Sequence, residues 1–149
     1  MSKVIRFMVV VLVLSGLIFA SVALADDGGK ITVKLSGLRN DSGTAYVVLF
    51  KSGEGFPMPS EKNTFAILSA PITPSLEGEA VFENVPYGEY AISVIHDENN
   101  DQQLNFNDQG VPLEGVGLSN NGDAADYEKA KFKLDSEELD VSIQMQYFQ

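Results

Sequence analysis

Residues 81–97, with the sequence VFENVPYGEYAISVIHD, decide the fold class of this chain. Two runs rich in aromatic and β-branched side chains flank a turn at residues 86–88, where Pro86 presets the backbone and Gly88 suits the last turn position. We therefore expect two strands joined as a hairpin. In the second run, residues 89–96, apolar side chains fall on both faces of an extended segment, which predicts a central strand buried on both sides.

The rest of the chain after residue 25 also has the period of strands. Apolar runs with strand patterning occur at residues 31–35, 44–51, 64–72, 79–85, 89–96, 127–134 and 141–147. We expect the first two to pair as a hairpin, and we expect a helical turn only within residues 60–70. About seven strands without crossover helices predict an all-β fold, a single antiparallel β-sandwich of the immunoglobulin-like or transthyretin-like kind.

The first 25 residues have the features of a cleaved secretory signal peptide. Two basic side chains precede an apolar run over residues 8–20, and Ala23 and Ala25 suit the recognition site of signal peptidase. An uncleaved membrane anchor is the alternative, because the apolar run approaches the length of a membrane span. We expect an exported protein, periplasmic or extracellular, with one domain over residues 26–149.

Composition restricts the partners of this domain. The chain has no cysteine, so its stability cannot depend on disulfides. Without Lys3 and Arg6 it carries 8 basic and 21 acidic side chains, a net charge of −13. Because that charge repels nucleic acid and anionic lipid, we expect a protein or glycan partner, no nucleic acid, and no stable membrane insertion after signal cleavage.

The polar segment at residues 97–126 is long for a loop in a small domain, and such loops are usually functional. Its first part alternates oxygen-bearing side chains, as calcium-binding loops do, with Leu104 as the apolar anchor and Gln102 where glycine is usual. The alternative is a loop whose side chains cap its own turns. The predicted calcium ligands, counted from the first loop position, are Asp97, Asn99, Asp101, Gln103 and Asp108.

Catalysis is the competing class of function. His96, Asp97 and Ser119 are the residue types of a hydrolytic triad, but Ser119 lacks the flanking glycines of a nucleophile elbow. Adjacent His96 and Asp97 would also point to opposite faces of a strand. One histidine and no cysteine disfavour zinc. We expect His96 to be structural, and we keep an extracellular hydrolase that uses His96 and nearby carboxylates as the alternative.

A second group of residues is predicted to bind a partner or to anchor the long loop. Leu113, Val116 and Leu118 either form an exposed surface or pack into the core, since glycines separate them. The expected function is an exported, non-catalytic binding or structural module. The residues in this group are His96, Leu113, Glu114, Ser119 and Asn120.

Two patterns in the sequence resemble known families. The spacing of apolar residues, proline and glycine over residues 82–94 resembles a hairpin of transthyretin-like and collagen-adhesin B-type sandwiches of secreted proteins. A longer pattern resembles the secreted bacterial family catalogued as domain of unknown function 2141, which implies an exported β-sandwich and no established activity. The residues that carry it are Gly55-Phe56-Pro57, His96-Asp97-x-Asn99, Leu104-Asn105-x-Asn107, Gly110-x-Pro112, Glu114-Gly115 and Gly117-x-Ser119-Asn120.

Overall fold

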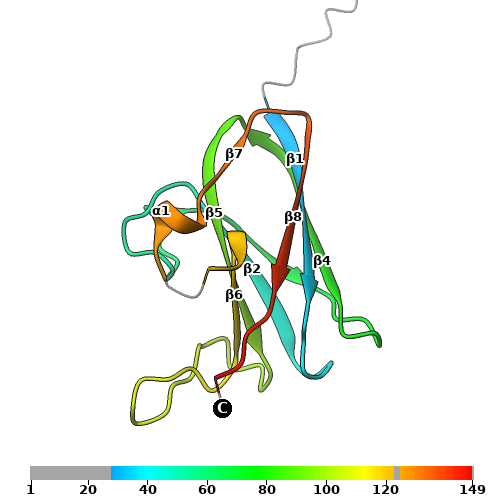
Figure 1. Cartoon of the computed structure of the whole chain (residues 1–149), viewed down its shortest axis with the longest axis vertical. Helices are drawn as coiled ribbons and strands as arrows, with labels where there is room; N and C mark the ends of the chain where they lie inside the picture. Colours follow the sequence, from blue (N-terminus) through cyan, green and yellow to red (C-terminus); the bar gives the residue numbers. More distant parts are fainter. Residues whose placement is uncertain (1–27, 123–124, 149) are drawn as a thin grey trace, which may run out of the picture.

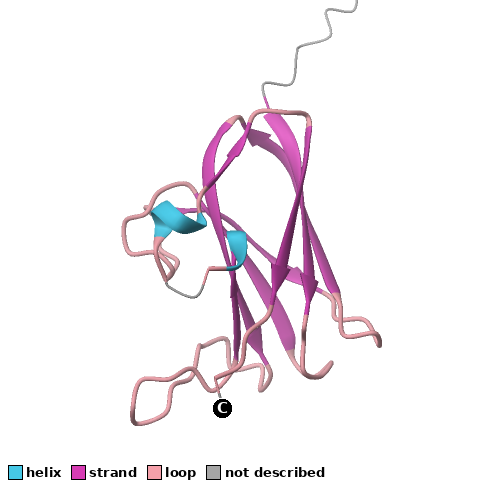
Figure 2. Ribbon diagram, viewed as in Figure 1, coloured by secondary structure: helices cyan, strands magenta, loops and turns pink. Residues whose placement is uncertain are grey.

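The computed structural model describes residues 28–122 and 125–148, and these form a sandwich of two β-sheets (Figures 1 and 2). Sheet A has the strand order β4-β1-β8, and sheet B has the order β3-β2-β5-β6 with β7 also paired to β5. The all-β sandwich predicted from the sequence is therefore confirmed. The strands are β1 (Gly28–Ser36), β2 (Thr44–Phe50), β3 (Thr64–Ala70), β4 (Gly78–Pro86), β5 (Gly88–Asp97), β6 (Gly115–Leu118), β7 (Phe132–Leu134) and β8 (Glu138–Gln144).

The inner faces of the two sheets form the hydrophobic core. In β1 the alternation seen in the sequence places Ile31, Val33 and Leu35 inside, with at most 2% of each side chain exposed. The core closes because alternate residues of every long strand point toward the opposite sheet. Its other large members include Val47, Leu49, Phe82, Val85, Tyr90, Ile92, Val94, Leu134, Ile143 and Met145.

The outer face of sheet A is polar. Lys30 forms an ion pair with Glu138 at 2.7 Å, and Lys34 forms one with Asp140 at 2.5 Å, across the β1–β8 pairing. Exposed Glu79 and other polar side chains of β4 continue this face. The outer face of sheet A is therefore a solvated surface of the usual kind.

The central strand predicted at residues 89–96 is β5, and its burial on both faces is confirmed. It pairs with β2 from Thr44↔Asp97 to Phe50↔Ala91 and with β6 on its other edge. Ile92 and Val94 point into the core, whereas Ser93 and Ile95 point to the outer face of sheet B. Asp97 ends the strand, and the long loop begins directly after it.

Both predicted hairpins are wrong. β4 pairs with β1 in sheet A, while β5 pairs with β2, β6 and β7 in sheet B, so residues 86–88 connect the two sheets. Likewise β1 and β2 lie in different sheets. A turn signal shows that the chain changes direction, but it does not show which strands pair. Here β5 has pairing partners on both of its edges within sheet B, and β4 pairs with β1 in sheet A.

One pairing departs from the antiparallel pattern. β1 and β8 are parallel, in register from Lys30↔Glu138 to Ser36↔Gln144. A parallel pair normally requires a crossover helix when its strands are close in sequence. Here the connection between the first and last strands is most of the sandwich itself, so no such helix is needed.

Three predicted element boundaries also need correction. The predicted loop at 97–126 contains strand β6 and a 3-10 turn, η1 (Ser119–Asn121). The predicted strand at 127–134 begins as a short helix, α1 (Tyr127–Ala130), which the Asp126 carboxylate caps by accepting the Glu128 N–H at 3.0 Å. The helical turn expected within residues 60–70 is replaced by a turn and strand β3.

The predicted signal peptide lies outside the described residues, among which no helix is long and apolar enough to cross a membrane.

Candidate functional site

Three carboxylates meet where β5 runs into the long loop. Asp97, Asp101 and Glu114 each offer an oxygen, and these oxygens lie within 4.8 Å of one another. Asp97 and Glu114 are almost fully buried, whereas Asp101 is exposed. The structure therefore brings together two of the predicted calcium ligands with a third carboxylate that the sequence placed among the partner-binding or anchoring residues.

Backbone N–H groups hold these carboxylates in place. Asp97 accepts from the N–H of Asp101 at 3.2 Å and from that of Gln102 at 2.7 Å. Glu114 accepts from the N–H of Glu98 at 3.2 Å and from that of Asn105 at 3.1 Å. A carboxylate has about four lone-pair positions, so each of these groups retains capacity for a cation after accepting two hydrogen bonds.

Amide side chains surround Asp101. Asn99 and Asn105 each donate a side-chain N–H to its Oδ2, at 3.2 and 3.0 Å, and Gln103 donates its backbone N–H to Oδ1 at 2.9 Å. The bond from Asn105, followed by that from Gln103, lowers the pKa of Asp101 below its ordinary value of 3.8. Asp101 is therefore ionised at neutral pH, as a cation ligand must be.

The turn after Asp101 takes the conformation that glycine would favour. Gln102 has φ of 61°, in the left-handed region, and Asn100 has φ of 58°. Gln102 stands where calcium-binding loops usually have glycine, and its backbone adopts the left-handed conformation that glycine favours. Asp108, the last predicted ligand, is exposed and is not part of the carboxylate group of the described residues.

His96 is fully buried on the opposite face of β5 from Asp97. Its Nε2 lies 2.7 Å from the Ser42 carbonyl, which can only accept, so Nε2 carries the proton and donates. Nδ1 lies 2.8 Å from the Tyr147 hydroxyl oxygen, with which it forms a second hydrogen bond. His96 thus links the end of β5 to the loop before β2 and to the C-terminal segment.

Arg39 joins the same three segments from outside. Its guanidinium forms two hydrogen bonds with the Glu98 carboxylate, at 2.6 and 3.0 Å, and lies 4.6 Å from the centre of the Tyr147 ring. It also donates to the Leu113 carbonyl at 3.1 Å. Chiefly through the bond from Arg39, the pKa of Glu98 falls below its ordinary value of 4.5. No sequence pattern predicted this ion pair, because Arg39 and Glu98 are far apart in the chain.

Ser119 and Asn120 anchor the segment after β6. The Ser119 hydroxyl is fully buried, donates to the Ala130 carbonyl at 2.6 Å, and accepts the Ile92 N–H at 2.9 Å. Asn120 donates to the carbonyls of Lys129 and Lys131. Ser119 lies beside Ile92, four residues before His96 on β5, so Ser119, His96 and Asp97 do not form a triad.

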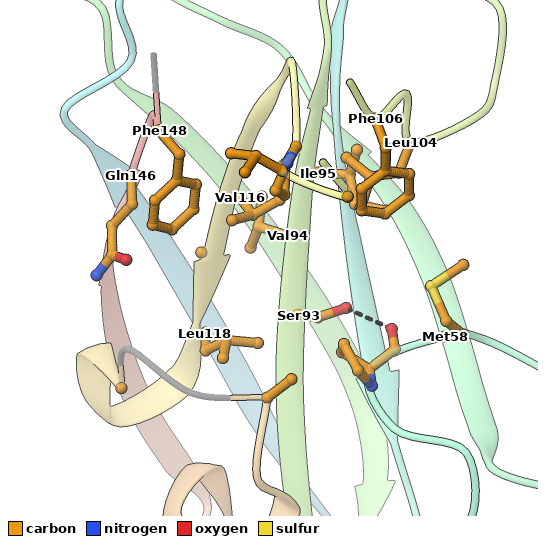
Figure 3. Close-up of a pocket in the computed structure, with 17 residues that line it drawn as sticks. Met58, Ser93, Val94, Ile95, Leu104, Phe106, Val116, Leu118, Gln146 and Phe148 are labelled. Atoms are coloured by element: carbon orange, nitrogen blue, oxygen red, sulfur yellow. Dashed lines mark hydrogen bonds between the residues drawn. The ribbon is translucent and has the colours of Figure 1, made fainter. Parts of the chain in front are cut away.

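The outer face of sheet B holds an apolar groove of about 490 Å³ (Figure 3). Ile95 of β5 and Val116 and Leu118 of β6 form its floor. In Figure 3 these side chains lie between Phe148 on one side and Phe106 and Met58 on the other. Met58, Phe106 and Phe148 are about half exposed, at 53%, 49% and 48%.

A second, smaller hollow continues this surface toward β3. Tyr46, Val48 and Ile67 line it, and it shares Ile95 and Leu104 with the groove. Beyond the hollows, the ring of Phe56 covers the other end of the outer face. Its centre lies 5.0 Å from the centre of the Phe50 ring and 5.7 Å from that of the Tyr127 ring. We call the two hollows together the sheet B groove.

The sequence contains a signal for this groove, but the pattern was interpreted only as evidence of buried strands. Residues 45–50 and 90–95 are apolar on both faces, which predicted central strands and did not separate core from groove. Val116 and Leu118 line the groove, while Gly115 and Gly117 face the core, where an added Cβ at Gly117 would lie 2.6 Å from Ile143.

Comparison with known proteins gives one result. A family model described as an uncharacterized protein conserved in bacteria, DUF2141, matches residues 33–142. The chain belongs to this family. The match covers both sheets, the carboxylate cluster and most of the groove, and it agrees with the resemblance found in the sequence. No curated protein and no solved structure matches the chain.

Proposed function

We propose that this DUF2141 protein is an exported, non-catalytic binding module whose site is the sheet B groove. The observation that carries the proposal is the contrast between its two outer faces. Sheet A presents charged side chains joined in ion pairs, whereas sheet B presents Ile67, Ile95 and Val116 in a hollow surface. Apolar patches rimmed by exposed aromatic and methionine side chains are typical of binding sites.

The buried position of His96 does not favour the hydrolase alternative. Both ring nitrogens have hydrogen bonds within the protein, and the side chain is 0% exposed. A general base must reach the proton that it abstracts. The ring nitrogens of His96 reach only Ser42 and Tyr147. Both contacts are explained by packing at the end of β5.

The first test is binding of Nile red, a neutral apolar dye, to the native protein. We expect its fluorescence to rise on binding and the rise to be largely lost in a Phe106→Ser/Phe148→Ser variant. Tyr87→Ser is the matched control, since Tyr87 is 45% exposed and does not line the groove. Equal dye binding by wild type and the double variant would reject the groove as a binding site.

We propose that bound calcium stabilises the long loop after β5, which forms one wall of the groove. Calcium takes oxygen ligands at about 2.3–2.6 Å, so two ligands of one ion are at most about 5 Å apart. The carboxylates of Asp97, Asp101 and Glu114 satisfy this limit. Leu104 and Phe106, on the same loop, line the groove, so a cation at the cluster would fix one wall of the site.

The calcium proposal predicts a shift of the melting temperature. With a dissociation constant on the order of 10⁻⁴ M, as in extracellular modules, a tenfold excess of calcium stabilises by about 1.4 kcal/mol. The melting midpoint should then rise by a few degrees relative to chelator. Asp97→Ala/Asp101→Ala should abolish the rise, and Asp108→Ala should retain it because Asp108 lies outside the cluster.

Two outcomes of the melting experiment would contradict this arrangement. If millimolar calcium leaves the wild-type midpoint at its value in chelator, the loop is held by its own hydrogen bonds alone. If Asp108→Ala abolishes the shift and Glu114→Gln does not, the ion is bound as the sequence count predicts, without Glu114.

A further inference from the structure

We infer that the partner of the sheet B groove is a basic amphipathic helix of another polypeptide, an inference that rests on the proposed function. The groove crosses β3, β2, β5 and β6, so its apolar floor extends over three strand spacings, about 14 Å. An apolar stripe at helical positions i, i+3, i+4 and i+7 covers about 10 Å. The floor therefore accommodates the apolar face of a helix of about three turns.

The floor of the groove offers side chains and almost no backbone hydrogen bonds. The edge of β6 is paired through Val116 and Gln146, whose backbone groups bond at 2.8 and 3.0 Å. The Ser93 hydroxyl already donates to the Pro57 carbonyl at 3.4 Å (Figure 3). A peptide lying across this floor, away from the open outer edge of β3, must satisfy its own N–H and C=O groups, and a helix does so whereas an extended chain does not.

The charges around the groove select a basic partner. Residues 97–122 carry five acidic side chains and no lysine or arginine, and residues 52–63, which flank the groove on the same side as Phe106, carry Glu54, Glu61 and Lys62. Arg39 pairs with Glu98, and Lys62 lies 3.9 Å from Glu54. Among the described residues no ion pair involves the exposed Glu61 or Asp108, and neither belongs to the carboxylate cluster proposed to bind calcium.

Two other occupants fit less well. A second copy of the chain would bring two acidic surfaces together, since each chain has a net charge of −11. A small apolar molecule would need convergent polar groups to orient it, and the hydroxyl on the floor, that of Ser93, is already bonded. Half-exposed Met58, Phe106 and Phe148 at the rim are instead the side-chain types that protein interfaces use as anchors.

The experiment uses three synthetic peptides of about 18 residues, long enough to form a helix. The first has leucine on one helical face and lysine elsewhere, the second replaces every lysine with glutamate, and the third scrambles the first. Titration into the folded protein, with and without calcium, measures each dissociation constant. We expect the first peptide to bind at least about tenfold more tightly than either control.

Variants of the protein then locate the peptide. Phe106→Ser/Phe148→Ser should weaken binding of the first peptide at least about tenfold, as loss of interface anchors does, and Tyr87→Ser should leave it unchanged. Glu61→Gln/Asp108→Asn should weaken it severalfold and reduce its dependence on salt. Glu79→Gln/Glu83→Gln, on the outer face of sheet A, is the matched charge control.

Several results would overturn the inference. Equal binding of the scrambled peptide would show that charge alone attracts it, and equal binding of the glutamate peptide would exclude a basic partner. A dimer lost in Phe106→Ser would identify a second copy as the occupant. Nile red binding in the groove without peptide binding would reject the helix alone, whereas loss of both would reject the proposed function as well.

Discussion

At the scale of single residues, two groups of charged side chains hold the end of β5: the cluster of Asp97, Asp101 and Glu114, and the ion pair of Arg39 with Glu98. Alternation after the strand predicted that Asp97 and Asp101 belong together, because a tight turn folds neighbouring side chains inward. Glu114 joins them only through the tertiary position of the loop's far end, as Arg39 joins Glu98. Local spacing holds no information about such contacts, so the third carboxylate and the ion pair could not be predicted.

His96 provides the first prediction at this scale. Removal of its ring would leave a cavity at a fully buried position, would remove the hydrogen bond to the Ser42 carbonyl, and would leave the Tyr147 hydroxyl with only the Arg39 N–H as partner. His96→Ala should therefore lower the free energy of unfolding by at least about 2 kcal/mol. Tyr147→Phe keeps the ring packing and should cost about 1 kcal/mol. Urea denaturation measures both.

A different pattern would revive the hydrolase alternative. If His96→Ala left stability within about 0.5 kcal/mol of wild type and abolished an activity of the protein, His96 would be catalytic and not structural.

The ion pair of Glu98 with Arg39 gives the second prediction. Because Arg39 lowers the folded-state pKa of Glu98, the pair contributes stability above the unfolded value of about 4.5, and that contribution is lost as the pH falls through the lower folded value. Glu98→Gln should be less stable than wild type at pH 7, and the difference should shrink in acid below about pH 4.5. Urea melts across this range measure it, with the exposed Glu83→Gln as control. A difference that is independent of pH would show that the effect is not ionic.

At the scale of secondary structure, strand existence was predictable and strand pairing was not. Period-two alternation identified β1, because burial of alternate side chains imposes it, and runs that are apolar on both faces identified β2 and β5. Strand β6 was missed because its inward positions are Gly115 and Gly117 and its apolar positions face the groove. The small inward residues match large side chains opposite them, Tyr147 and Ile143, which no local pattern predicts.

Strand β6 supplies the third prediction. A Cβ added at Gly115 would lie 2.5 Å from the Tyr147 ring, which is held by His96 and Arg39. Gly115→Ala should therefore destabilise the protein by about 1–3 kcal/mol, the usual cost of overpacking. Gly88→Ala is the matched control, since its nearest new contact is at 3.6 Å, and it should stay within about 0.5 kcal/mol of wild type. Equal urea midpoints for the two variants would show that β6 can shift away from the Tyr147 ring without loss of stability.

At the scale of the whole molecule, the two outer faces of the sandwich differ in character. Sheet A presents charged side chains in ion pairs, whereas the sheet B groove exposes apolar side chains. The sequence predicted the two-layer fold because few other arrangements bury so many short strands. It did not predict the parallel β1–β8 pair, which depends on where the two ends of the chain meet.

Export is the last prediction, and it belongs to the whole chain. Small residues at Ala23 and Ala25 follow the apolar run at residues 8–20, and acidic residues begin at Asp26. Signal peptidase should therefore cleave after Ala25, and the protein isolated from its own host should begin at Asp26. Intact mass measurement checks this. Ala23→Leu/Ala25→Leu is the matched control, because large side chains at these positions block cleavage and should leave the full-length chain attached to the membrane. If wild type and control have the same retained N-terminus, residues 1–25 act as an anchor, and any binding at the sheet B groove takes place at a membrane surface.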